Sequence, residues 1–145
     1  MTRQFAAPIG LVFDVFTKPE HMRKTIAPFG EEVTTCDIDL RVGGTYHYVF
    51  KPDESTECSF RGTFLEVEAP ARLRQTWQFE GWPGVEAVES MDFTEAHGVT
   101  TMSYGLAFGD QAGRDRFGGT EALDSNFDQV EALLRTLVEE GAGGA

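Results

Sequence analysis

Basic residues are scarce in this sequence. Lysine and arginine total 12 against 24 aspartate and glutamate residues, which gives a formal net charge of −12 at pH 7. A nucleic-acid-binding protein needs a basic surface for phosphates, and attraction to an anionic membrane also requires basic residues. The charge balance therefore argues against a nucleic-acid partner and against a membrane partner.

Long apolar runs are also missing. No run approaches the ~18 apolar residues that a membrane span requires. The first apolar stretch, residues 5–16, is interrupted by Pro8, Gly10 and Asp14 and carries no signal-peptide cleavage pattern. We therefore expect a soluble, cytoplasmic protein.

Cysteine and histidine are too few and too scattered for the common metal sites. Cys36 and Cys58 have no cysteine or histidine at metal-ligand spacing, and in a reducing compartment both are expected to be free thiols. His21, His47 and His97 each lack a serine, cysteine or second histidine nearby. The sequence therefore predicts no metal and no cofactor.

Helical spacing of apolar residues occurs near both ends of the chain. Residues 8–16 and 18–26 are predicted to form two short helices, the second of which would begin in a capping box of Thr17 and Glu20. Residues 120–139 are predicted to form a long amphipathic helix, and 141–144 a frayed end. The apolar face of the long helix carries Leu123, Phe127, Val130, Leu134 and Leu137.

Between these helices, apolar residues alternate with a period of two in six segments, and a short strand is expected before residue 6. Strands joined by hairpins predict an antiparallel sheet. In the segment around Phe64, Leu65 and Val67 are expected on the face opposite Phe64. Turns are expected at His97-Gly98, and the glycine-rich residues 109–119 are predicted to form a loop. The whole chain, 1–145, is expected to form a single domain, which its length allows.

Several segments along nearly the whole chain resemble those of one protein family. They are Phe5-Ala6-Ala7-Pro8, Lys18-Pro19-Glu20-His21-Met22, Asp39-Leu40-Arg41-Val42-Gly43-Gly44-Thr45-Tyr46, Phe60-Arg61-Gly62-Thr63-Phe64-Leu65-Glu66-Val67 and Pro70-Ala71-Arg72-Leu73. In these segments the sequence resembles bacterial relatives of the C-terminal domain of the heat-shock protein 90 ATPase activator homologue. That family belongs to the START-type, pollen-allergen-like helix-grip superfamily. The resemblance implies an α+β helix-grip fold: a curved seven-stranded antiparallel sheet with two short helices and a long C-terminal helix.

Inward-facing strand positions and the apolar face of the long helix form a candidate ligand pocket. Large apolar side chains dominate these positions, and phenol and indole groups among them could orient a ligand. The candidate ligand-binding residues are Tyr46, Tyr48, Phe50, Phe60, Trp77, Met91, Met102, Tyr104, Leu123 and Phe127. An aromatic stripe of this kind is also typical of a filled core. The resemblance favours a cavity, because helix-grip folds commonly enclose one.

Glu66 and Glu89 are the carboxylates whose strand parity could direct them into the pocket. An enclosed carboxylate could act as a general base with a raised pKa. On the outer surface it would instead form a salt bridge with Arg61 or Arg74. The alternation leaves the inward face of the strand around Glu89 undecided.

We therefore expect this protein to bind a small hydrophobic or amphipathic molecule, such as a lipid, as a monomer or homodimer, and not to be an enzyme. One alternative is an enzyme of cyclase, dehydratase or hydrolase type in the same cavity, for which Glu66, Glu89 and Tyr104 are the candidate acid–base groups. The resemblance also implies a second alternative, a co-chaperone-like interaction domain.

Overall fold

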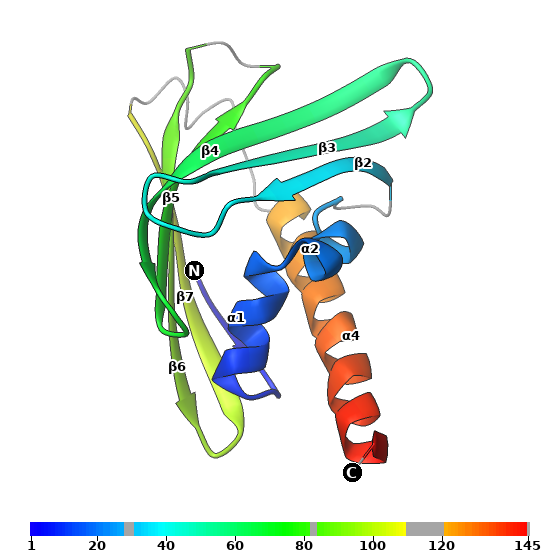
Figure 1. Ribbon diagram of the computed structural model, residues 1–145, viewed down its shortest axis with the longest axis vertical. Coiled ribbons are helices and arrows are strands. Elements are labelled where there is room, and N and C mark those ends of the chain that lie inside the picture. Colours follow the sequence, from blue (N-terminus) through cyan, green and yellow to red (C-terminus); the bar gives the residue numbers. More distant parts are fainter. Residues whose placement is uncertain (28–30, 82–83, 110–120, 145) are drawn as a thin grey trace.

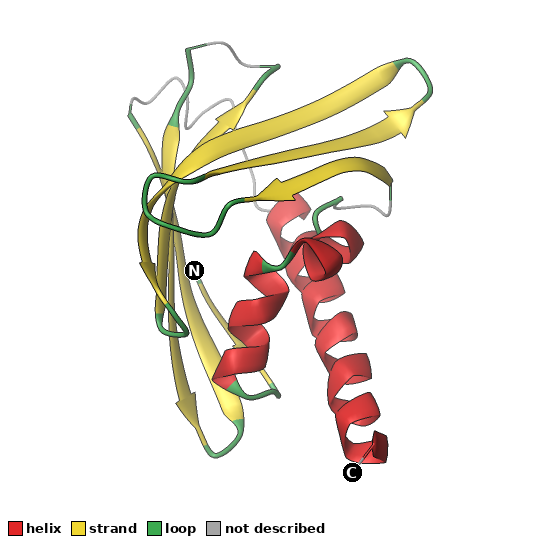
Figure 2. Ribbon diagram, in the orientation of Figure 1, coloured by secondary structure: helices red, strands yellow, loops and turns green. Residues whose placement is uncertain are grey.

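A curved antiparallel sheet forms one side of the molecule, and the helices lie on its concave side (Figures 1 and 2). The computed structural model describes residues 1–27, 31–81, 84–109 and 121–144. The strands are β1 (Thr2–Phe5), β2 (Glu32–Ile38), β3 (Thr45–Asp53), β4 (Thr56–Glu68), β5 (Arg72–Phe79), β6 (Ala87–Ala96) and β7 (Val99–Phe108).

The seven strands lie in the order β1-β7-β6-β5-β4-β3-β2, and all neighbours are antiparallel. Strands β2 to β7 follow one another as a meander, and β1 completes the sheet by pairing with β7. The turn between β6 and β7 contains His97 and Gly98 with φ of 55° and 78°. Two successive positive φ angles are typical of the tight hairpin turns that match strand twist. The predicted α+β architecture and the seven-stranded sheet are confirmed.

Three helices are described: α1 (Ile9–Thr17), α2 (Pro19–Thr25) and α4 (Glu121–Gly144). Helix α1 lies between the sheet and α4, and the β2–β4 end of the sheet arches over α2 (Figure 1). The long helix continues through the glycines where a frayed end was predicted. Apart from Gly109, the predicted loop 109–119 lies outside the described residues.

The predicted capping box at the start of α2 is wrong. The Thr17 hydroxyl donates to the carbonyl oxygen of Phe13 at 2.8 Å, so it is used within the last turn of α1. Lys18 occupies the N-cap position of α2 and makes no side-chain cap hydrogen bond. Pro19 at the first helical position needs no N–H acceptor, which lowers the demand for a cap.

A bulge in β4 corrects the predicted faces at the end of that strand. Phe64 lies opposite Gln75, but Glu66 lies opposite Arg74, so one extra residue enters β4 at Leu65. The extra residue reverses the alternation. As a result, Leu65 is exposed and Val67 packs against the core.

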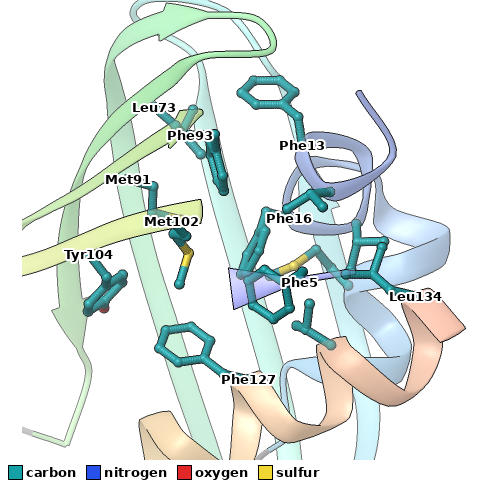
Figure 3. Packing of buried hydrophobic residues seen from close by; sticks show 14 of the residues in the cluster. Phe5, Phe13, Phe16, Leu73, Met91, Phe93, Met102, Tyr104, Phe127 and Leu134 are labelled. Carbon is teal, nitrogen blue, oxygen red and sulfur yellow. The ribbon is translucent and has the colours of Figure 1, made fainter. Parts of the chain in front are cut away.

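The core lies between the concave face of the sheet and the helices (Figure 3). Phe16 of α1 is central to it: its ring centroid lies 5.8 Å from that of Phe93 on β6 and 6.2 Å from those of Phe5 and Phe127. This aromatic cluster joins α1 and α4 to strands β1 and β6, and so fixes how far α4 stands from that part of the sheet. Across the described helices, none has the length and apolar character needed to cross a membrane.

Candidate functional site

A cavity of about 300 Å³ lies between the sheet and the helices. Strands β3 to β7 form one wall. Helices α1, α2 and α4 form the other, together with Ile26, which directly follows α2. The lining residues are Phe16, Met22, Thr25, Ile26, Tyr46, Tyr48, Phe50, Phe60, Gln75, Trp77, Phe79, Glu89, Met91, Tyr104, Leu123, Asn126, Phe127 and Val130. The volume falls at the lower end of the ~300–1,000 Å³ of small-molecule sites.

Nine of the ten candidate residues named from the sequence line this cavity. They are Tyr46, Tyr48, Phe50, Phe60, Trp77, Met91, Tyr104, Leu123 and Phe127. Met102 does not line it: its side chain is fully buried within the packed cluster (Figure 3). Tyr104 and Phe127 face each other across the space between β7 and α4, with ring centroids 5.3 Å apart.

Sequence reasoning missed part of the lining. Gln75 and Phe79 have the same strand parity as Trp77, so the alternation of β5 could have found them. Val130 follows Phe127 by three residues on the same helix face, a second usable signal. Phe16, Met22, Thr25, Ile26 and Asn126 reach the cavity only because α1, α2 and α4 pack together, and no local pattern indicates that packing.

Glu89 is the carboxylate of the cavity, which decides the question that the alternation left open. The Gln75 amide Nε2 donates to Glu89 Oε1 at 2.6 Å, and the Tyr104 hydroxyl donates to Glu89 Oε2. Strand register produces this group, because Gln75 lies directly opposite Glu89 and Tyr104 opposite Met91, two residues further along β6. Three adjacent strands thus hold one carboxylate in place.

Burial controls the protonation of this group. Removal from water raises the pKa of Glu89, while the hydrogen bonds from Tyr104 and Gln75 partly oppose the rise. Burial, reinforced by the nearby Glu89 carboxylate, also raises the pKa of Tyr104 well above its usual value. Tyr104 therefore keeps its proton and acts as a donor.

The Tyr46 hydroxyl is bound within the sheet instead of being directed at a ligand. It donates to the carbonyl oxygen of Thr76 on β5 at 2.5 Å, crossing the intervening strand β4 beside Gly62. A Cβ on Gly62 would stand 1.9 Å from that carbonyl oxygen and 2.7 Å from the Tyr46 hydroxyl. Glycine at position 62 is therefore required for the Tyr46 side chain to pass.

Glu66 lies outside the cavity. The bulge at Leu65 turns it to the outer face of the sheet, where its carboxylate pairs with Arg74 at 2.7 Å and Arg72 at 3.4 Å. Arg72 also binds Asp92 at 2.9 Å. Glu66 is thus a surface ion-pair residue and is removed from the set of acid–base candidates.

Polar side chains of α4 fasten its first turns to the end of α2. Asn126 Nδ2 donates to the carbonyl oxygens of Thr25 and Ile26 at 2.7 and 2.8 Å, and Gln129 Nε2 donates to that of Ala27 at 2.7 Å. These carbonyl groups at the helix end have no partner within α2. The contacts hold the two helices together where both line the cavity.

The histidines and cysteines lie elsewhere. On the outer face, His47 Nε2 lies 2.8 Å from the Ser59 hydroxyl. Cys36 on β2 and Cys58 on β4 are free and separated by β3. Within the described ranges, no three histidine, cysteine, aspartate or glutamate side chains gather as a metal site would require.

A curved antiparallel sheet that grips a C-terminal helix around an apolar cavity defines a helix-grip protein. The family model described as "Activator of Hsp90 ATPase homolog 1-like protein" matches residues 6–135, and the chain belongs to this family. No curated protein matches the chain.

Solved structures share the fold at low sequence identity. A protein from Rhodobacter sphaeroides has a TM-score of 0.85 and 18% identity, with 94% of this chain and 90% of that chain covered. Protein Ms6760 from Mycobacterium smegmatis has a TM-score of 0.80 and 23% identity, covering 92% and 87%. An HSP90 activator from Plasmodium falciparum has a TM-score of 0.58 and 21% identity, covering 74% and 69%.

Proposed function

We propose that the protein binds a small amphipathic molecule in the cavity between the sheet and α4. The supporting observation is the cavity itself: about 300 Å³, walled mainly by apolar and aromatic side chains, with the Glu89 carboxylate and its two hydrogen-bond donors in the wall. Binding sites for small molecules combine a predominantly apolar lining with a few placed polar groups in this way. The nine lining residues named from the sequence are proposed as ligand contacts, together with Gln75 and Glu89.

Saturable binding of a neutral apolar dye tests this proposal. N-phenyl-1-naphthylamine fluoresces in apolar surroundings, and Trp77 in the cavity wall would transfer excitation energy to a dye bound there. We expect one dye per chain and a matching loss of tryptophan emission. The absence of saturable binding would contradict the proposal and leave a filled core.

Two substitutions on α4 separate cavity binding from surface binding. Leu123→Trp would fill part of the cavity, because Leu123 lines it. Leu133→Trp makes the same change on the same helix at a partly buried position that does not line the cavity. The first variant is expected to weaken dye binding by about tenfold or more, and the second to leave it within about threefold.

The Glu89–Tyr104 pair supports a second candidate, an enzyme that moves a proton inside the cavity. A dehydratase could use Glu89 to remove a proton next to a ketone as hydroxide leaves with a proton from Tyr104. An aryl β-hydroxyketone tests this activity, because loss of water forms a conjugated enone that absorbs in the near ultraviolet. Enone formation that Glu89→Gln abolishes would favour the enzyme, and no enone formation would favour a binding protein.

The family description and one surface feature support a third candidate, a co-chaperone-like interaction. Leu40, Val42 and Leu65 are exposed, and their segments are joined by a hydrogen bond from Gly43 N to Phe64 O at 2.9 Å. Apolar side chains clustered at a surface are typical of protein contacts. Stimulation of an Hsp90 ATPase that Val42→Asp abolishes would favour this function.

A further inference from the structure

Glu89 supplies the only formal charge among the described residues that line the cavity. No lysine, arginine or histidine belongs to that lining, and Glu89 forms no ion pair in the part of the chain that the structure describes. The described arginines with carboxylate partners bind Glu66, Asp92 and other groups outside the cavity. Any formal charge that the described lining carries is therefore negative.

The Glu89 carboxylate also has unused acceptor capacity. A carboxylate offers about four lone-pair positions. The described residues fill two of them, one with the Gln75 amide and one with the Tyr104 hydroxyl, and both of these donors are neutral. A donor from a ligand can occupy a third position without displacing either one.

Aromatic rings surround the same space. Tyr48, Trp77, Tyr104 and Phe127 line the cavity from four different elements, and Tyr104 both donates to Glu89 and packs edge-on against Phe127. A cation is attracted to the face of an aromatic ring, and the attraction strengthens where water is excluded. The carboxylate and the aromatic rings thus both favour a positively charged ligand group.

We propose that the cavity takes a small ligand with a protonated amine at the end of an apolar body, and that the ammonium group lies against Glu89. This inference rests on the proposed function, since it names the chemical class of the ligand. A carboxylic acid is disfavoured, because its charge would meet Glu89 and find no described cation in the lining. An alcohol can donate to Glu89 but gains neither the ion pair nor the attraction to the rings.

Three probes of one shape test this proposal: 3-phenylpropylamine, 3-phenylpropan-1-ol and 3-phenylpropanoate. Each is titrated against the protein carrying bound N-phenyl-1-naphthylamine, and displacement of the dye gives its affinity. We expect the amine to bind at least about tenfold more tightly than the alcohol, and the acid to bind most weakly.

Glu89→Gln keeps the shape of the side chain and removes its charge, so in this variant the amine should bind within about threefold of the alcohol. Glu57→Gln, at an exposed position on β4, removes the same charge outside the cavity and should keep the order of the three probes. If Glu89→Gln does not fold, titration at about 0.5 M salt replaces it. Salt screens exposed charges far more than an enclosed ion pair, so the amine preference should persist.

The outcomes separate this inference from the proposed function. Dye binding with no amine preference, or a preference that survives Glu89→Gln or vanishes in salt, overturns the amine inference and leaves ligand binding intact. Failure of the dye itself to bind overturns both.

Discussion

Glu89 is held by two neutral donors and by no described cation, and this arrangement makes its charge sensitive to pH. Burial raises its pKa above the ordinary value of 4.5. The folded chain therefore holds this proton more tightly than the unfolded chain does. The stabilisation that follows is complete below about pH 4.5 and is lost as the pH rises through the pKa of the folded state.

Glu89→Gln should remove this part of the pH dependence. The variant cannot ionise at this position. As the pH rises from about 4.5, its free energy of unfolding should therefore increase relative to that of the wild type. Urea unfolding at several pH values measures the difference, with Glu57→Gln as the control for loss of one carboxylate. A difference between wild type and Glu89→Gln that stays constant with pH would contradict the raised pKa of Glu89.

Phe127 and Phe64 are nearly equally buried, at 3% and 2% exposure, but only Phe127 lines the cavity. Phe64→Ala should cost the ~3–5 kcal/mol typical of a filled core. Phe127→Ala should cost less, because part of its ring already faces cavity space instead of packed atoms. Denaturant unfolding of both variants makes the comparison, and equal losses would indicate that the cavity is filled in solution.

The Tyr46 side chain crosses strand β4 at Gly62. Replacing this glycine should therefore cost more stability than replacing Gly105, which has no close neighbour. Gly62→Ala places a Cβ against the Thr76 carbonyl oxygen and should destabilise the protein by ~1–3 kcal/mol. Gly105 is exposed on β7 with no atom within 4 Å of an added Cβ. Gly105→Ala should therefore be neutral or stabilise by up to about 1 kcal/mol. Thermal unfolding tests the pair, and equal effects would exclude the close approach at Gly62.

The elements of this fold follow from local periodicity, which is why their order and the sheet could be predicted. The capping box failed because Thr17 completes a hydrogen bond with Phe13 inside the preceding helix, a competition that the pattern does not reveal. The face of the sheet on which Glu66 lies could not be predicted, because the single inserted residue Leu65 reverses the alternation of the strand.

The site was predictable only where it follows strand parity. Parity groups Tyr46 with Tyr48, and Trp77 with Gln75, but it does not say which face of a strand is inward. For Glu89, that choice depends on β5 and β7, the neighbours that supply Gln75 and Tyr104. The contribution of α2 to the cavity wall depends on Asn126 of α4. Its side chain hydrogen-bonds to the end of α2, although the two segments are about 100 residues apart in the sequence.

The acidic excess acts on the chain as a whole. A net charge of −12 on 145 residues produces mutual repulsion in the compact state. Exposed ion pairs such as Arg41–Asp39 contribute only ~0–1 kcal/mol each, so their screening costs little. Sodium chloride should therefore raise the melting temperature by a few degrees. Calorimetry at low and moderate salt tests this, and a fall in melting temperature would show that ion pairs dominate.

The first of the seven strands to be synthesised pairs with the last. Thr2 lies opposite Ser103, and Arg3 reaches Asp128 on α4 at 2.5 Å. During synthesis, about 100 residues must be added after β1 before its partner strand β7 is complete. This takes roughly 5–20 s at ~5–20 residues per second. Pairing across such a separation is also slow in itself. Phe5, fully buried in the finished protein, lacks the cover that β7 provides throughout that interval, and only nearby segments such as α1 can shield it from water.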